Sequence, residues 1–335
     1  TQKTPQQLFE LFDKATEILQ AALNCSYLDA LLENAENIID NNTVRVDEGV
    51  PDEKTVNELQ KIYQELNLQN VKPEIIRQII QLSFLKVIRK DAIQANHQMT
   101  PDTIGLIMAF LIEKVTKIKE IKTVFDPAVG TANLLTTVMN QLKVNGDKDI
   151  VGYGIDNDED MLGVASVNTE LQHLNVKLYH QDAVTALDIS QCDLAISDLP
   201  IGYYPLDENA KNYQTRAKEG HSYVHHLLIE QSMNYLKPGA FGVFLVPSSL
   251  FQTKESQSFV KWIQSVAYLQ GLINLPAELF ANPNAQKSIL LLQRQGGDSK
   301  QAVKVLLGEF PSFKDKAKFA SFMDDISKWV TTNLR

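Results

Sequence analysis

The chain has little cysteine, no long apolar run and no overall excess of basic residues. Its 335 residues include two cysteines, Cys25 and Cys192, whose separation argues against a disulfide framework or a cysteine metal site. No window of about 18 uninterrupted apolar residues occurs, so no transmembrane helix is expected. Residues 1–7 have no apolar core and do not read as a secretory signal. We therefore expect a cytoplasmic protein without membrane contact.

The net charge of -9 is unevenly distributed. Residues 211–335 carry 15 basic and 9 acidic side chains, whereas the remainder of the chain is acidic. A nucleic-acid-binding protein needs a local basic face rather than a basic total. Two interpretations of this C-terminal third stay open: a surface that contacts the phosphates of a nucleic acid, and an ordinary solvated surface of mixed charge. Its basic residues include Lys211, Arg216, Lys218, Lys254 and Lys261.

Two regions of the chain differ in their apolar pattern. Apolar residues recur at helical spacing before residue 96, which predicts an all-helical N-terminal domain over residues 1–95. Buried-strand patterns alternate with helical ones over residues 96–335, which indicates an α/β domain with a mainly parallel sheet. The last two predicted strands, 269–275 and 288–293, are close in sequence, so we expect one antiparallel strand at the sheet edge.

One turn of the second region carries a single glycine. Residues 123–125 form a predicted buried strand and residues 131–142 a predicted helix, with Gly130 between them. Dinucleotide-binding turns use three glycines because a pyrophosphate must lie against bare backbone. A single glycine suits a cofactor without phosphate, such as S-adenosyl-L-methionine. The turn therefore favours methyl transfer over nicotinamide chemistry.

Four predicted strands end near an acidic residue, and parallel strands place these residues at one edge of the sheet. Ligands of open α/β sheets bind outside this carboxyl edge. An acid at the tip of the second strand, Asp156, can bind both hydroxyls of a ribose. Asp182, after the third strand, can accept from an adenine amine. The histidines of residues 221–226 lack a cysteine or paired acid at metal spacing, so no metal site is predicted.

Several segments, in order, resemble the adenine-specific N6 DNA methyltransferases, above all the modification subunit of type I restriction systems. Met99-Thr-Pro101 is similar to the entry motif of that family, which lies over the methionine end of the cofactor. Residues 126–130, Asp-Pro-Ala-Val-Gly, resemble its glycine turn. Residues 198–202, Asp-Leu-Pro-Ile-Gly, take the place of its Asn/Asp-Pro-Pro-aromatic catalytic motif. The resemblance covers residues 95–295 and implies a Rossmann-like class I methyltransferase sheet.

The strand ends and the resemblance together predict the site residues. The predicted cofactor-binding residues are Met99, Thr100, Asp126, Pro127, Ala128, Gly130, Thr131, Asn133, Leu134, Asp156, Asn157, Asp182 and Ala183. The predicted catalytic residues, which hold the adenine amine, are Asp198, Leu199 and Pro200. The predicted substrate contacts are Ile201, Tyr203 and Tyr204.

Two departures from the family pattern bear on activity. Leu199 replaces the first proline, and Ile201 replaces the aromatic residue that stacks on a flipped-out adenine in the family. Stacking on one base is worth roughly 1–3 kcal/mol, so base capture should be weaker unless Tyr203 or Tyr204 supplies a ring. Nothing after residue 295 resembles a target-recognition domain. Sequence specificity would then need a specificity subunit or be absent.

Three functions are consistent with these features. The first is N6-adenine methylation of DNA, and the retained acid Asp198 favours it. The second is a regulatory or scaffold protein that binds S-adenosyl-L-methionine but has lost base methylation. The third is methyl transfer to RNA or protein, and the replacements at Leu199 and Ile201 favour the second and third. The oligomeric state and the sequence context of any target are not given by the sequence.

Overall fold

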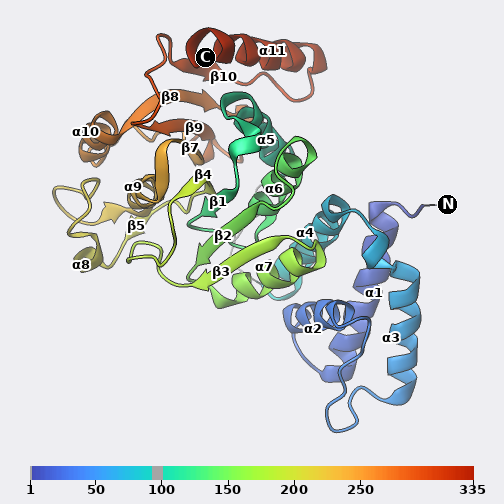
Figure 1. Cartoon of the computed structure of the whole chain (residues 1–335). Coiled ribbons are helices and arrows are strands. Elements are labelled where there is room, and N and C mark those ends of the chain that lie inside the picture. Colours follow the sequence, from blue (N-terminus) through green and yellow to red (C-terminus); the bar gives the residue numbers. More distant parts are fainter. Residues whose placement is uncertain (1, 93–100) are drawn as a thin grey trace.

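The computed structural model describes residues 2–92 and 101–335, which form a helical bundle and an α/β domain (Figure 1). The predicted boundary between residues 95 and 96 lies outside the described residues, so this division stays a prediction. Met99 and Thr100 of the predicted entry motif also lie outside them. No helix in the described ranges is long and apolar enough to cross a membrane.

Four helices form the N-terminal bundle, namely α1 (Pro5–Leu23), α2 (Tyr27–Ile39), α3 (Glu53–Leu66) and α4 (Pro73–Lys90). The side chains of Thr4, Ser26 and Asp52 each accept a hydrogen bond from a backbone N–H in the first turn of the helix that follows. Such caps pair N–H groups that a helix start would leave unsatisfied. The apolar stripes of the four helices meet in one buried core.

An eight-stranded sheet has the order β10-β8-β9-β7-β4-β1-β2-β3. Its strands are β1 (Thr123–Asp126), β2 (Val151–Asp156), β3 (Asn175–His180), β4 (Cys192–Asp198), β7 (Leu236–Pro247), β8 (Ala267–Asn274), β9 (Lys287–Arg294) and β10 (Leu306–Glu309). β9 is antiparallel to both of its neighbours, and the other neighbouring pairs described are parallel. The predicted Rossmann-like sheet with one antiparallel strand is thus confirmed.

The antiparallel strand lies inside the margin of the sheet, between β7 and β8. Its residues 289–292 form a continuous apolar run and are buried, as expected for a strand covered on both faces. Beyond β8, the C-terminal segment adds β10, and α11 (Lys316–Asn333) packs against the core through Ile326, Trp329 and Val330. Residues after 295 therefore complete the sheet and its core.

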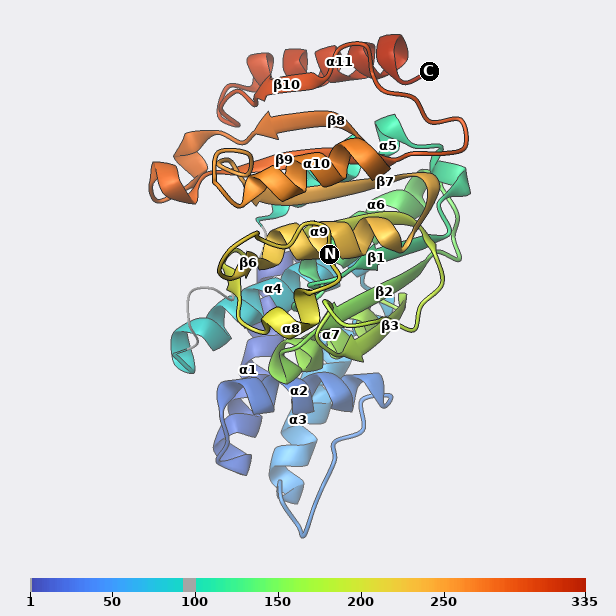
Figure 2. The ribbon, with the colours of Figure 1, turned by 90° about the vertical axis from the view of Figure 1, so that its left-hand side faces the viewer.

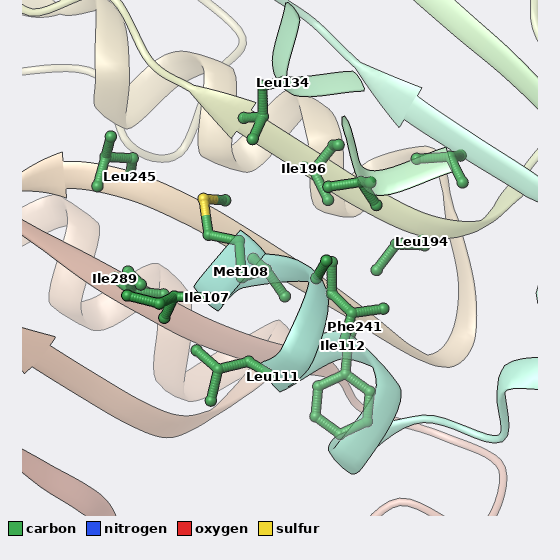
Figure 3. Close-up of a cluster of buried hydrophobic side chains, with 14 of the residues drawn as sticks. Ile107, Met108, Leu111, Ile112, Leu134, Leu194, Ile196, Phe241, Leu245 and Ile289 are labelled. Carbon is green, nitrogen blue, oxygen red and sulfur yellow. The ribbon is translucent and has the colours of Figure 1, made fainter. Parts of the chain in front are cut away.

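Helices cover both faces of the sheet (Figures 1 and 2). α5 (Asp102–Val115), α6 (Asn133–Asn145) and α11 contribute to one core, and α9 (Val224–Asn234) and α10 (Ser256–Val266) to the other. Neighbouring strand residues alternate between the two cores, as the pleat requires. Residues of β4, β7 and β9 on the α5 side are drawn in Figure 3 and include Leu194, Ile196, Phe241, Leu245 and Ile289.

α7 (Glu159–Leu171) joins the two regions of the molecule. Leu162 and Ala165 on one side of this helix belong to the core of the sheet. Met161 and Val164, on its other side, belong to the core of the bundle. The bundle therefore packs directly on the α/β domain.

The segment after β4, which the sequence predicts as a long loop, contains a small hairpin. β5 (Tyr203–Tyr204) pairs antiparallel with β6 (Ser222–Tyr223), which sets Tyr203 opposite Tyr223. The short helix α8 (Asp207–Ala210) lies between these two strands in the chain. The hairpin fixes the start of the segment next to the end of β4.

Candidate active site

The turn after β1 is organised around the carboxylate of Asp126. Its Oδ1 accepts hydrogen bonds from the Ala128 N–H (3.0 Å) and from the Ser197 hydroxyl of β4 (2.7 Å). The side chain is 1% exposed, and this burial raises the pKa of Asp126 to about 7. Gly130 has a φ of +56°, a left-handed conformation that glycine adopts without strain. Asp126 thus shapes the turn from inside.

Asp156, at the end of β2, closes onto the same turn. Its Oδ2 accepts from the Gly130 N–H (2.8 Å), and its Oδ1 accepts from the Asp158 N–H (2.9 Å). Burial raises the pKa of Asp156. The backbone of Asn157 also donates to this carboxylate, and since an ionised carboxylate offers about four acceptor positions, these backbone donors do not exhaust it. The adjacent Asn157 is exposed, and its carbonyl contacts His180 Nε2 at 3.0 Å.

Asp182, just after β3, is held by backbone and side-chain donors. Its Oδ1 accepts from the Val184 N–H (2.9 Å) and its Oδ2 from the Tyr204 hydroxyl (2.5 Å). Burial raises the pKa of Tyr204 to about 12, so the hydroxyl keeps the proton it donates. Tyr204 is only 6% exposed, and Ala183 is buried. The ring of Tyr204 is therefore not presented to a ligand, whereas its hydroxyl fixes Asp182.

Asp198 ends β4 and forms an ion pair that the sequence does not predict. Lys287 Nζ, from the start of β9, lies 2.8 Å from Asp198 Oδ1, and both side chains are about one-quarter exposed or less. Because β9 is antiparallel, its first residue lies at the edge where the parallel strands end. Leu199 is buried and its N–H donates to the Leu245 carbonyl (3.3 Å).

Exposed side chains follow Asp198 in the chain. Pro200 and Ile201 are exposed, Ile201 by 53%. Tyr203 is 56% exposed and stacks on Tyr223, with ring centroids 4.7 Å apart and an interplanar angle of 13°. Its hydroxyl donates to Glu255 at 3.2 Å. Of the two predicted tyrosines, Tyr203 is thus the one with an accessible ring.

Buried aromatic side chains support Tyr223 from behind. His225 and His226 contact its ring, and His226 also stacks on Phe259 with centroids 4.4 Å apart. Burial lowers the pKa of His225 to about 3 and that of His226 to about 4. Both imidazoles are therefore neutral at physiological pH. The two histidines therefore add no charge to the aromatic cluster that contacts Tyr203 and Tyr223.

The remaining predicted cofactor residues differ in what their side chains do. Pro127 and Thr131 are buried in the turn, and Leu134 points into the core of the sheet (Figure 3). The Oδ1 of Asn133 accepts a hydrogen bond from Arg77 of α4 (2.8 Å). Sequence reasoning missed this arginine, which lies 56 residues earlier in the chain. The structure thus brings Gly130 into direct contact with Asp156, sets Asp126 in the same turn and turns Asn133 toward the bundle.

The fold and the acids at the strand ends define a class I S-adenosylmethionine-dependent methyltransferase. The model of the N-6 DNA methylase family matches residues 84–330, and that of the YtxK N-terminal helical domain matches residues 6–88. The chain belongs to the N-6 DNA methylase family. S-adenosyl-L-methionine is therefore its cofactor, and the partly exposed carboxylate of Asp156 is an acceptor of the kind that a ribose hydroxyl requires.

Relatives extend over nearly the whole chain. The protein YtxK of Bacillus subtilis (strain 168), itself uncharacterized, is 35% identical over 322 residues, 96% of each chain. A crystal structure from Listeria monocytogenes, described provisionally as a class I S-adenosylmethionine-dependent methyltransferase, is 42% identical with a TM-score of 0.87. It covers 97% of this chain and 98% of its own.

The fold is also similar to that of subunits of restriction-modification systems. The methyltransferase subunit of a type I restriction-modification system from Streptococcus thermophilus has a TM-score of 0.63 at 13% identity. The match covers 95% of this chain and 74% of that subunit. At this identity the likeness concerns the fold alone.

Proposed function

We propose that this protein transfers the methyl group of S-adenosyl-L-methionine to the N6 amine of adenine in DNA. The carboxylate of Asp198 carries the proposal, because it stands at the sheet edge that also holds Asp126 and Asp156. An acceptor at that position can hold an amine beside the cofactor. Family membership supports methyl transfer, and the choice of adenine in DNA is our inference.

The cofactor half of the site lies at the ends of β1, β2 and β3. Asp156 binds the ribose hydroxyls through its remaining acceptor capacity, and Asp182 and Ala183 border the adenine ring. Asn157 lies beside the ribose, and the backbone from Asp126 to Thr131 lines the methionine side. When bound, S-adenosyl-L-methionine supplies an electrophilic methyl group on a sulfonium.

Asp198 acts on the amine. The exocyclic nitrogen of adenine is a poor nucleophile because its lone pair is delocalised into the ring. The Asp198 carboxylate and the Leu199 carbonyl each accept one amine hydrogen, which favours a pyramidal nitrogen and orients its lone pair. The carboxylate also stabilises the positive charge that develops on the nitrogen. The Leu199 N–H bond to Leu245 fixes the backbone at this point.

Tyr203 supplies the aromatic surface that Ile201 does not. A target base must leave the duplex to reach Asp198, and a stacking partner offsets part of that cost. Tyr203 is more than half exposed and is held in place by Tyr223 and Glu255. Since an unpaired base reaches this ring without the cost of breaking a base pair, single-stranded or mismatched DNA should be methylated faster than paired DNA.

Exposed basic side chains near the hairpin contact the DNA backbone. Lys211, Arg216 and Lys218 are exposed, and Lys218 reaches Gln257 of α10. Each cation that neutralises a phosphate contributes about 0.7–0.9 to the slope of log K against log salt. Replacing the three residues with alanine should therefore flatten the salt dependence of DNA binding, measured by fluorescence anisotropy. An unchanged slope would remove this surface from the proposal.

Sequence recognition by a separate specificity subunit is part of the same proposal. Residues 306–309 and 316–333, which follow the last predicted strand, belong to the sheet and its core. They therefore do not form a separate domain for reading a target sequence. Without a partner, the protein should methylate adenine with little sequence preference.

One observation favours a second candidate, a cofactor-binding protein without base methylation. Lys287 donates to Asp198 Oδ1 and so competes with an adenine amine for the same carboxylate. An amine that displaces this lysine has to offset the loss of the ion pair. If the pair never opens, the site binds the cofactor and does no chemistry on DNA.

A transfer assay separates the two candidates. The purified protein is incubated with S-adenosyl-L-methionine and single-stranded, mismatched or duplex oligonucleotides, and the nucleosides are analysed by mass spectrometry. We expect N6-methyladenine, formed fastest on the single strand and reduced at least about 100-fold in Asp198→Ala. Equal transfer by Asp198→Ala would exclude its role. No transfer by a protein that binds the cofactor would favour the second candidate.

A further inference from the structure

Arg77 connects the helical bundle to the two helices that open the α/β domain. It lies on α4, and its side chain is completely buried. Nη1 donates to Asn133 Oδ1 (2.8 Å) in the first turn of α6 and to Asp102 Oδ1 (2.9 Å) in the first turn of α5. Nε and Nη2 donate to Glu74 of α4 at 2.9 and 2.6 Å. One guanidinium thus contacts three elements.

A second series of hydrogen bonds links Glu74 of α4 to the backbone of Thr131, in the turn after β1. Glu74 Oε2 accepts from Asn140 Nδ2 of α6 (3.4 Å), which also donates to Gln172 Oε1 (2.9 Å). Gln172 Nε2 donates to Asn168 Oδ1 of α7 (2.7 Å), and Asn168 Nδ2 donates to the Thr131 carbonyl (3.1 Å). Residues 131–133 are therefore held from both sides by a network based on α4.

The charge of Arg77 makes the loss of any of its hydrogen-bond partners costly. Burial disfavours the charged guanidinium, but the hydrogen bonds to Glu74 and Asp102 outweigh it and raise the pKa of Arg77. A buried cation without its partners is strongly destabilising. Any displacement of the first turn of α6 would remove one of these partners. Buried polar networks whose members are all paired rigidify the segments that they join.

We propose that Arg77 is a positioning residue for the cofactor, and that the helical bundle is consequently part of the cofactor site. Through Asn133, Arg77 keeps the turn after β1 in the conformation that binds the cofactor, and Asp102 holds the guanidinium in place for that contact. The bundle then sets cofactor affinity without contacting the methyl acceptor. This inference goes beyond the proposed function, because it holds whatever the acceptor is.

Lys86 offers a matched control on the same helix. It is a partly buried cation with two carboxylate partners, Asp13 and Glu17, each 2.7 Å away. Both partners lie on α1, within the bundle. Arg77→Met and Lys86→Met each remove a paired cation from α4. Only the former removes a bond to the cofactor turn.

The test measures S-adenosyl-L-methionine binding by calorimetry at a temperature where each variant is folded. We expect Arg77→Met to bind about tenfold more weakly and Lys86→Met to bind within about twofold of the unaltered protein. Arg77→Lys keeps the charge, but a lysine ammonium cannot bond all the groups that the planar guanidinium contacts. This variant should therefore restore binding only in part. Hydrogen exchange of the backbone amides at residues 130–134 should be faster in Arg77→Met alone.

Two results would overturn the proposal. One is unchanged affinity in folded Arg77→Met, and the other is an equal loss of affinity in Lys86→Met, which would indicate general destabilisation. If Arg77→Met does not fold, Asp102→Asn replaces it, since Asp102 is 39% exposed and tolerates change better. That variant should bind the cofactor several-fold more weakly, and unchanged affinity would also overturn the proposal. None of these measurements uses a methyl acceptor, so they stay decisive if the proposed function is wrong.

Discussion

The cofactor half and the acceptor half of the site are held together in different ways. In the cofactor half, Asp126 and Asp156 accept hydrogen bonds from backbone N–H groups of the turns that they organise. In the acceptor half, Asp198 is paired with the flexible side chain of Lys287, and Tyr203 is more than half exposed. Backbone geometry fixes the first half, whereas side chains that can exchange define the second. In the function we propose, the cofactor site is thus rigid and the acceptor site is adjustable.

The largest expected effect comes from breaking the rigid half. Asp156→Ala removes two hydrogen bonds to ribose hydroxyls, each worth about 1.5–3 kcal/mol because the acceptor is charged. It also leaves the Gly130 N–H without its carboxylate. Binding of S-adenosyl-L-methionine should weaken at least about 100-fold by calorimetry. The exposed Asp160→Ala is the control, and tight binding by Asp156→Ala would exclude the role of Asp156.

Asp126 allows the rigid half to be tested without a ligand. Burial raises its pKa from 3.8 to about 7, so between these values the folded state holds a proton that the unfolded state has released. Stability should therefore fall as the pH rises through this window, by on the order of 4 kcal/mol.

Asp126→Asn removes this dependence and keeps an acceptor for Ala128 and Ser197. Its stability relative to the unaltered protein should increase from about pH 4 to about pH 7, as measured by urea unfolding. Parallel pH profiles of the two proteins would contradict a buried, protonated Asp126.

Tyr203 tests the adjustable half. Tyr203→Ala should raise the KM for DNA roughly 5- to 150-fold, since stacking on one base is worth about 1–3 kcal/mol. Ile201→Tyr adds a ring next to Asp198 and should lower that KM. Tyr204→Phe is the matched control, because the Tyr204 ring is buried and its change should affect cofactor binding instead. An unchanged KM in Tyr203→Ala would show that the base does not stack there.

The smallest effect is expected at Lys287. A partly exposed ion pair is worth about 1 kcal/mol or less, so Lys287→Met should lower the KM for DNA by up to about fivefold. The affinity for S-adenosyl-L-methionine should not change. Lys237→Met is the control, since Lys237 pairs with Asp193 (2.8 Å) at the opposite end of β4. A higher KM in Lys287→Met would show that the lysine assists acceptor binding rather than competing with it.

Much of the parallel half of the sheet could be predicted because β1, β2 and β4 are short, mainly apolar runs that end in an acid, and an acid also closely follows β3. Asp126, Asp156 and Asp182 emerge from this local pattern without knowledge of their partners. Lys287 does not, because its contact with Asp198 joins residues 89 apart and depends on the register of an antiparallel strand. The contact of Arg77 with Asn133 is equally non-local.

The hairpin and the C-terminal helix were missed for different reasons. Two-residue strands are too short to show an alternating pattern, and neighbouring strand residues face opposite ways. The sequence therefore could not tell that Tyr203 is exposed and Tyr204 buried. α11 did carry a signal, because apolar residues recur at helical spacing from Phe319 to Val330. It lies beyond the motifs that carry the family resemblance, which end at residue 295, although the family model extends to residue 330.

The most direct test of adenine methylation is mass spectrometry of nucleosides from the genomic DNA of cells with and without this protein. We expect N6-methyladenine to fall when the protein is removed, to return with the unaltered chain and not to return with Asp198→Ala. Equal levels of N6-methyladenine in both cell types, for a protein that binds S-adenosyl-L-methionine, would contradict it.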